Sequence, residues 1–346
     1  MPPVDDPPST HAMDVDGDED LDVPAPPPPK SAIPWVEKHR PANISGVSGH
    51  SQITSSLSSA IKTGQLPHLL FYGPPGTGKT SMALALCNNL WSPSLRKSRV
   101  LVMNASDDRG LSVVRNKIKS FASLTVTTPT PADLASHPCP PYKVIILDES
   151  DTMTHDAQAA LRRVIETYSR VTRFVLICNY VTRIITPLAS RCSKYRFTPL
   201  PDTCIRDRLE YICKEESVAV SDPVLTSIIS TSGGDMRSAV TTLQSVTALT
   251  STPTVADVVE MSGKIPAETL QPLISAIKAR DWSKMQSAVD DLTLSGHPAS
   301  SILLGVSDAV TDDADLSDLA KANVAVKVGE AERRIKEGGE EWIVVM

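Results

Sequence analysis

The sequence of 346 residues contains few aromatic side chains, which make up 4% of it, and no apolar run that approaches the roughly 20 residues of a membrane-spanning helix. Its first residues also lack the apolar stretch of a secretory signal peptide. These absences indicate a soluble protein with no membrane partner. Because 41% of the residues are nevertheless hydrophobic, the chain can bury the cores of two or three domains of roughly 150 residues each.

The six cysteines include no C-x-x-C pair. Structural zinc sites and disulfide frameworks depend on paired or regularly spaced cysteines. We therefore expect a reducing compartment, in which these thiols act as small buried hydrophobic groups.

Acidic and basic residues both occur in every part of the chain, but their balance differs strongly from one part to the next. The formal net charge of −6 does not show this difference. Residues 1–33 carry 8 acidic residues and 1 lysine, residues 34–200 carry 20 basic and 9 acidic residues, and residues 201–346 carry 13 basic and 23 acidic residues. The three segments therefore have net charges of −7, +11 and −10. A basic segment of this kind suits a phosphate backbone, so overall acidity does not exclude a nucleic-acid partner.

The chain divides into four predicted regions. Residues 1–33 are rich in proline and aspartate, which predicts a disordered tail. From residue 34 to 200, short apolar runs alternate with helical patterns, which predicts an α/β domain with a mostly parallel, twisted sheet and helices on both faces. From residue 201 onward only helical periods remain, and we predict two all-α domains, at 201–262 and 263–346.

The predicted elements are short and are separated by turn residues. Strands are expected at residues 69–72, 100–103, 144–147, 173–178 and 195–197. Helices are expected at residues 79–90, 111–122, 157–168, 203–216, 223–230, 235–249, 268–279 and 282–292. The proline-rich stretch at 129–141 predicts a surface loop.

A phosphate-binding motif directly follows the first predicted strand and opens a helix: Gly73-Pro74-Pro75-Gly76-Thr77-Gly78-Lys79-Thr80. Its glycines let consecutive backbone N–H groups converge on a triphosphate. Lys79 then reaches the β- and γ-phosphates, and the Thr80 hydroxyl is a ligand for Mg²⁺. The motif and Ser81 after it predict a site for ATP and Mg²⁺.

Polar residues that follow two later strands could bind Mg²⁺ and position the attacking water at this site. Asp148 ends the strand at 144–147 and would hold Mg²⁺ through its water shell, and Glu149 could orient and polarise the attacking water. Asn179 ends the neighbouring predicted strand, where its amide can position that water or contact the γ-phosphate, although an ordinary turn asparagine is the alternative.

Two arginines could stabilise the charge that phosphoryl transfer develops, either within the chain or in a neighbouring subunit. Arg191 precedes an apolar strand, and Arg237 lies in the first turn of a helix. Arg115 and Lys119 stand four residues apart on the helix at 111–122. A basic helix face is often merely solvated, but the charge of +11 favours contact with a phosphate backbone.

These motifs recur in order with PWVEKHRP at 34–41, NASDDRG at 104–110, LDESD at 147–151, LICNY at 176–180, SRC at 190–192 and GDMRSA at 234–239. Together they strongly resemble the small subunits of eukaryotic replication factor C, the clamp loader of the AAA+ ATPases, over residues 34 to about 300. The resemblance implies a RecA-like AAA+ ATPase domain at 34–200, a helical lid at 201–262 and a helical collar at 263–346.

The resemblance also implies partners and roles. Four other replication factor C subunits would complete a nuclear pentamer that, with ATP bound, opens the sliding clamp PCNA and grips primer–template DNA, and that releases the closed clamp on hydrolysis. By position, Asn179 matches sensor 1, Arg237 matches sensor 2, and Arg191 matches the arginine finger offered to a neighbour's ATP. Val36 and Arg40 would line the nucleotide base, and Arg109, Arg115 and Lys119 would contact DNA.

The chain departs from the family pattern at His39, where members usually have tyrosine, and at Ser150, where they usually have alanine. Residues 333–346 are expected to end before the last collar helix of the family is complete. Two alternatives stay open: a subunit that holds ATP structurally and lends only Arg191 to its neighbour, and an AAA+ remodeller of proteins. The intact Glu149, Asn179 and Arg237 favour catalysis.

Overall fold

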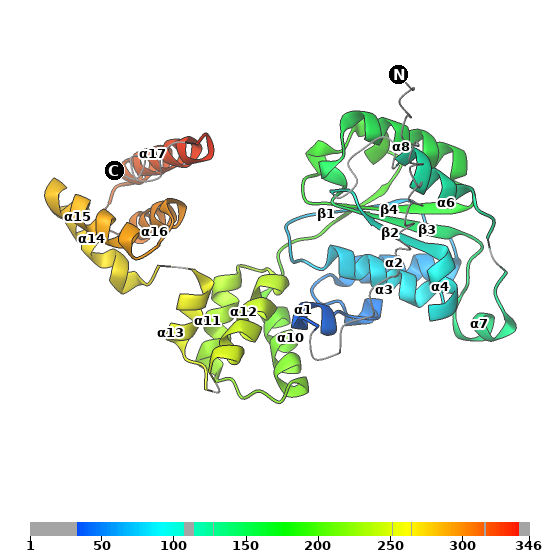
Figure 1. The fold of residues 1–346 in the computed structure, drawn as a ribbon, viewed down its shortest axis with the longest axis horizontal. Helices are drawn as coiled ribbons and strands as arrows, with labels where there is room; N and C mark the ends of the chain where they lie inside the picture. Colours follow the sequence, from blue (N-terminus) through cyan, green and yellow to red (C-terminus); the bar gives the residue numbers. More distant parts are fainter. Residues whose placement is uncertain are drawn as a thin grey trace, which may run out of the picture. The chain divides into compact units, whose positions relative to one another are not determined.

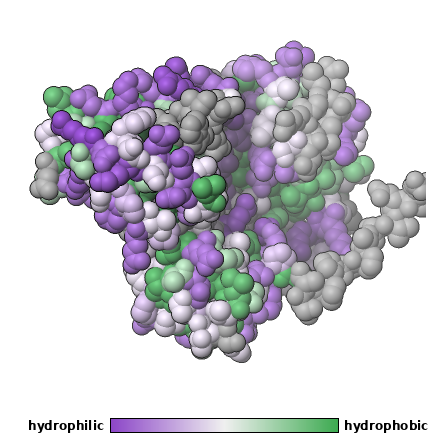
Figure 2. Space-filling model, turned by 60° about the vertical axis from the view of Figure 1, so that its left-hand side comes forward, coloured by the Kyte–Doolittle hydropathy of each residue, from purple (hydrophilic) through white to green (hydrophobic). Residues whose placement is uncertain are grey.

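The computed structural model describes residues 33–106, 114–126, 128–250, 252–263, 265–314 and 316–338. The predictions for the tail at 1–32, for Arg109, for the start of the helix at 111–122 and for residues 339–346 therefore lie outside the described residues. Among the described residues, no helix combines the length and the apolar character needed to cross a bilayer. Figure 2 shows hydrophilic and hydrophobic residues intermixed on one face of the molecule.

A five-stranded sheet lies at the centre of the N-terminal half (Figure 1), with the strand order β2-β3-β4-β1-β5. All of its strand pairs are parallel. The strands are β1 Leu69–Tyr72, β2 Val100–Asn104, β3 Lys143–Asp148, β4 Thr172–Cys178 and β5 Ser193–Arg196. The predicted parallel α/β sheet is confirmed, although β5 begins two residues earlier than expected and ends before Phe197.

Helices cover both faces of the sheet (Figure 1). Helices α2, α3 and α4 contribute to one hydrophobic core, and α6, α8 and α9 contribute to the other. Their bounds are α2 Ser51–Thr63, α3 Lys79–Leu90, α4 Pro93–Arg99, α6 Lys119–Ser123, α8 His155–Tyr168 and α9 Thr186–Ala189.

The central strands are apolar on both sides because successive side chains point to opposite faces. In β3, Val144 and Ile146 join the first core, whereas Ile145 and Leu147 join the second. The parallel arrangement brings the carboxyl ends of β1, β3 and β4 to the same edge of the sheet. The residues that follow these three strands therefore meet there.

The prediction of a continuous α-helix at 111–122 is wrong in the part that the structure describes. A π-helical turn, η3 Val114–Ile118, precedes α6. Apolar residues four apart fit a π turn as well as an α turn, so the sequence pattern cannot distinguish them.

The loop predicted at 129–141 contains a short helix, α7 Pro131–Ser136. Thr130 caps it and forms a capping box with Asp133, and Pro131 occupies its first turn. Proline is tolerated there because the first N–H groups of a helix have no partner within the helix. The proline content that predicted a loop therefore marks a helix start.

Four helices pack around one core after β5: α10 Asp202–Glu215, α11 Asp222–Ser232, α12 Met236–Leu249 and α13 Val255–Ser262. The last of these has no counterpart among the predicted helices. The short helix α1 Trp35–Lys38 also belongs to this group, because Trp35 and Val36 pack against its core.

A separate core joins α14 Ala267–Ala279, α15 Trp282–Leu294 and α16 Ala299–Asp312. The last described helix, α17 Asp318–Lys336, buries none of its residues. Three short 3-10 helices complete the described elements: η2 Ile44–Gly46, η4 Ser150–Thr152 and η5 Val181–Arg183. The all-α character predicted beyond residue 200 is confirmed.

Candidate active site

The loop between β1 and α3 requires glycine at two positions, because both space and backbone conformation exclude a side chain. Gly73 and Gly76 have φ angles of 144° and 66°. An added Cβ would lie 2.1 Å from the carbonyl oxygen of Phe197 at Gly73, and 1.6 Å from Asp235 Oδ1 at Gly76. The loop is therefore packed closely between Phe197, which follows β5, and Asp235, which caps α12.

The Lys79 ammonium lies inside this loop. Its side chain is buried, and its Nζ donates hydrogen bonds to the carbonyl oxygens of Gly73 at 2.9 Å and Pro74 at 2.7 Å. Burial lowers the pKa of Lys79, and the nearby Asp148 carboxylate partly opposes this shift. An anion bound in the loop would compensate the buried charge.

Thr80 and Asp148 meet in front of the loop, where the Thr80 hydroxyl donates a hydrogen bond of 2.7 Å to Asp148 Oδ2. Oxygen ligands of this kind are those that Mg²⁺ prefers. Within the described part of the chain, no group of three or more His, Cys, Asp or Glu residues could hold a metal ion. Mg²⁺ is often bound by one or two carboxylates together with substrate phosphates, and Asp148 with the Thr80 hydroxyl offers ligands of that kind.

Glu149 lies at the end of β3 in a left-handed conformation, with a φ of 51°. Its backbone N–H donates a hydrogen bond of 2.9 Å to Asp148 Oδ1, and its side chain is exposed in the lining of the cavity. A left-handed residue other than glycine carries strain, and such strain concentrates at functional sites.

Asn179 lines the same cavity and is held there by Asp151. The carboxylate Oδ2 of Asp151 accepts hydrogen bonds of 3.2 Å from the backbone N–H groups of both Asn179 and Tyr180. Asp151 belongs to the LDESD motif, which does not by itself reveal a role for this carboxylate. The structure shows that it ties the end of β4 to the turn after β3.

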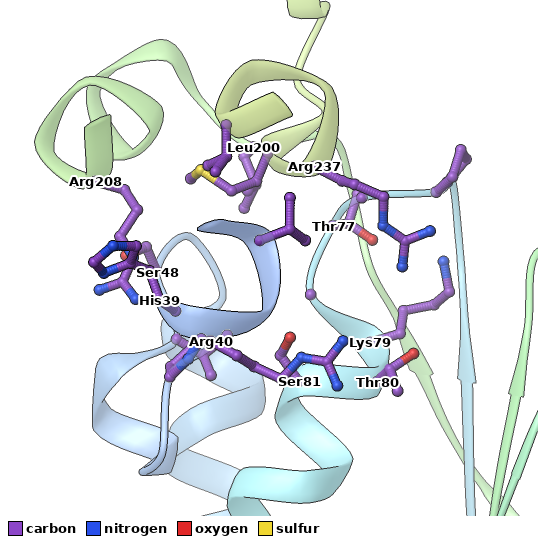
Figure 3. Close-up of a pocket in the computed structure, with 18 of the residues that line it drawn as sticks. His39, Arg40, Ser48, Thr77, Lys79, Thr80, Ser81, Leu200, Arg208 and Arg237 are labelled. Carbon is purple, nitrogen blue, oxygen red and sulfur yellow. Dashed lines mark hydrogen bonds between the residues drawn. The ribbon is translucent and has the colours of Figure 1, made fainter. Parts of the chain in front are cut away.

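The start of α12 closes the cavity from the side of the helical group. The backbone N–H of Met236 donates a hydrogen bond of 3.2 Å to the carbonyl oxygen of Gly76, and Asp235 caps the helix. Arg237 and Lys79 extend toward the same part of the cavity (Figure 3). Two cations that converge in this way favour an anionic ligand between them.

The opposite side of the cavity has a different lining. His39 and Arg208 lie together there, away from Lys79 (Figure 3). The sequence-based predictions include no site role for several other lining residues, among them Trp35, Val47, Ser48, Leu200, Arg208, Ile212, Met236 and Val240. Trp35 and Met236 lie in the motifs PWVEKHRP and GDMRSA, which could have identified them. Arg208, Ile212 and Val240 lie in amphipathic helices and carry no such signal.

Most residues predicted to bind nucleotide or to act in catalysis line this one cavity. They are Val36, Arg40, Pro75, Gly76, Thr77, Gly78, Lys79, Thr80, Ser81, Asp148, Glu149, Asn179 and Arg237. Gly73 and Pro74 contribute the carbonyl groups that hold Lys79. The departure at Ser150 is accommodated, because its buried hydroxyl donates a hydrogen bond of 2.8 Å to the carbonyl of Leu147.

Other predicted residues lie outside the cavity lining. Arg191 pairs with Glu166 of α8 at 2.5 Å and donates a hydrogen bond of 2.5 Å to the carbonyl of Pro187. Lys119 is exposed at the start of α6. The backbone of Arg115 belongs to η3, whereas its side chain and all of Arg109 lie outside the described residues.

Replacing Gly76 with Ala is expected to destabilise the protein more than replacing Gly64, at the end of α2. The two residues have φ angles of 66° and 68°, so alanine costs about 1–2 kcal/mol at either position. Nothing lies within 4 Å of an added Cβ at Gly64, whereas the clash at Gly76 adds about 1–3 kcal/mol. Urea unfolding of both variants measures the difference, and equal losses would contradict the close contact between the loop and α12.

Three family models match consecutive parts of the chain. The model of the ATPase family associated with various cellular activities (AAA) matches residues 69–200. The model of the RCF1/5-like, AAA+ ATPase lid domain matches residues 207–248, and that of the replication factor C C-terminal domain matches residues 265–345.

Curated relatives match most of the chain. Replication factor C subunit 4 of Arabidopsis thaliana is 45% identical over 319 residues, which are 92% of this chain and 94% of that protein. Replication factor C subunit 2 of Oryza sativa subsp. japonica is 44% identical over 317 residues, which are 91% and 93% of the two chains. Replication factor C subunit 2 of Saccharomyces cerevisiae is 49% identical over 280 residues, or 78% of each chain.

Among solved structures, a variant of the RuvB protein of Thermotoga maritima matches with a TM-score of 0.51 at 16% identity, covering 70% of this chain and 81% of that chain. At this identity the likeness concerns the fold alone. The resemblance inferred from the motifs is confirmed by the family models and the curated relatives. The chain thus belongs to the replication factor C subunits, with an AAA ATPase domain followed by a helical lid and the C-terminal domain of that family.

Proposed function

We propose that this chain is an ATP-hydrolysing subunit of a nuclear clamp loader, which joins four other replication factor C subunits to load the sliding clamp PCNA onto primer–template DNA. One observation supports catalysis in particular. A single cavity joins the cations Lys79 and Arg237 to the oxygen ligands of Thr80 and Asp148 and to the exposed carboxylate of Glu149.

In this proposal the triphosphate lies between Lys79 and Arg237, with the backbone of the phosphate loop beneath it. Thr80 and Asp148 would hold Mg²⁺, which would neutralise charge on the phosphates. Glu149 would accept a proton from the attacking water, and Asn179 would orient that water. Val36 and Arg40 would contact the base. The chain thus retains a group for each step of hydrolysis, which favours it over a subunit that only holds ATP.

The assembly tests the proposal most directly. Purification of the tagged full-length chain from its own cells, followed by native mass spectrometry, is expected to yield a complex of five subunits. That complex should load PCNA onto primed circular DNA with ATP and fail to load it with a non-hydrolysable ATP analogue. A monomer, or a complex that loads no PCNA, would contradict the proposed function.

Replacing Arg115 and Lys119 with Ala is expected to weaken binding of the complex to primer–template DNA and to reduce its salt dependence. Each phosphate contact that is lost lowers the slope of log K against log salt by about 0.9 for duplex DNA. Titration of fluorescent DNA at several salt concentrations measures both quantities. The matched control is Lys62→Ala, which removes an exposed lysine from α2. If the double variant behaves like this control, η3 and α6 do not contact DNA.

A further inference from the structure

A group of polar and charged residues joins the segment before the first strand to helix α10 and the residue that follows it. We name this group, Lys38, His39, Arg208 and Glu216, the α1–α10 clasp. We propose that Glu216 is a positioning residue for the end of the ATP cavity opposite the phosphate loop, and that it acts by holding His39 against that end. The proposal rests on the cavity being the ATP site.

Glu216 is the centre of the clasp. Lys38 Nζ lies 2.6 Å from Glu216 Oε1, and His39 Nε2 contacts the same oxygen. The Lys38 side chain is 43% exposed, whereas those of His39 and Glu216 are only 8% and 13% exposed. The pKa of Glu216 is lowered, mainly by its hydrogen bond with Lys38 and also by that with His39. The carboxylate is therefore ionised and largely shielded from water, a setting in which loss of one partner is costly.

Arg208 adds a second link between the same two segments. Its guanidinium donates a hydrogen bond to the backbone carbonyl of His39 and lies 5.0 Å above the ring of Tyr211. His39 is thus held by its side chain through Glu216 and by its backbone through Arg208. Both His39 and Arg208 line the cavity, whereas Glu216 is not part of its lining. Glu216 can therefore affect a ligand only through the residues that it holds.

The segment that contains His39 is anchored on both sides of the cavity. On the side of the helical group, the backbone N–H of Trp35 donates a hydrogen bond of 3.0 Å to Gln244 Oε1 of α12. On the side of the sheet, the carbonyl of Ala42 accepts a hydrogen bond of 2.8 Å from Asn88 Nδ2 of α3. The clasp lies between these anchors, so it sets how closely the segment approaches a ligand.

The phosphate loop occupies the other end of the cavity, where Lys79 and Arg237 converge (Figure 3). Since the triphosphate lies there, the end at His39 and Arg208 accepts the remaining part of the nucleotide, its base and ribose. Loosening the clasp should therefore weaken the binding of a complete nucleotide without changing how the loop binds phosphates. This separation distinguishes a positioning role from a general loss of structure.

Replacing Glu216 with Ala is expected to raise the KM for ATP about tenfold in a reconstituted complex whose other ATP sites have been inactivated, as for the loss of one hydrogen bond to a charged group. The kcat should change less than about twofold, because Glu216 touches no reacting atom. Inorganic tripolyphosphate, which lacks base and ribose, should inhibit the variant as strongly as the unaltered complex. A variant with unchanged KM, or one that loses affinity for ATP and tripolyphosphate equally, would overturn the proposal.

Two further variants test whether Glu216 acts through its hydrogen bond with His39 or only through its negative charge. Glu216→Gln keeps an oxygen that accepts a hydrogen bond from His39, and should recover most of the ATP affinity. Glu215→Ala removes an exposed carboxylate from the adjacent position of α10 and should leave KM unchanged. If Glu216→Gln were as impaired as Glu216→Ala, the route through His39 would be wrong. These experiments measure the KM for ATP and the inhibition by tripolyphosphate. A complex that failed to bind DNA or PCNA would contradict the proposed function but not the role of Glu216 in nucleotide binding.

Discussion

Replacing Glu149 with Gln is expected to lower ATP turnover by about 10²- to 10⁴-fold, the contribution typical of a general base, while ATP still binds. Glu149 is exposed in the cavity beside Asp148, and its amide replacement keeps the size of the side chain but cannot accept a proton. The loss is measured as single-turnover hydrolysis, with DNA and PCNA present, in a reconstituted complex in which every other ATP site has been inactivated. A filter-binding assay with labelled ATP measures the retained affinity.

The matched control for this change is Asp156→Asn, which removes an exposed carboxylate from the first turn of α8. It should leave turnover unaltered because it lies outside the cavity lining. If Glu149→Gln left turnover as high as this control does, the chain would hold ATP structurally and serve its neighbour only through Arg191. The same experiment therefore decides between ATP hydrolysis by this chain and the structural ATP-binding role that the motifs leave open.

Replacing Arg191 with Ala is expected to reduce hydrolysis about 10³-fold at the site of the adjacent subunit, the lower end of what an arginine finger contributes. Arg191 lies outside the lining of the cavity in its own chain, and its ion pair with Glu166 keeps it at the surface. Its guanidinium can therefore act in catalysis only on ATP bound elsewhere. The effect is measured as single-turnover hydrolysis in a reconstituted complex in which only that adjacent site retains its catalytic glutamate.

Arg162→Ala is the control for Arg191, since Arg162 contacts the same oxygen of Glu166 at 3.1 Å. Both substitutions remove one partner of Glu166, so any structural consequence of breaking that network should be similar. Only Arg191→Ala is expected to slow the adjacent site. Equal rates in the two variants would show that Arg191 serves local structure and is not an arginine finger.

The phosphate loop and its strand could be predicted because the information is local. Residues 69–72 and 79–90 coincide with β1 and α3 in the structure. The carboxylates after β3 and the amide after β4 follow from the same logic, since parallel strands share one carboxyl edge. The helix at 131–136 and the π turn at 114–118 were not predicted, because their residue patterns also fit a loop and an α-helix.

The sequence alone determined the family of this protein and the order of its domains, and it predicted which residues would surround a triphosphate, because each of these is encoded in short motifs and in apolar periodicity. Only the tertiary structure decided what closes the cavity. The contact of Asp235 with Gly76 and the link of Glu216 to His39 join residues more than 150 positions apart. Such contacts depend on how the helical group packs against the loop and α1, which no local pattern specifies.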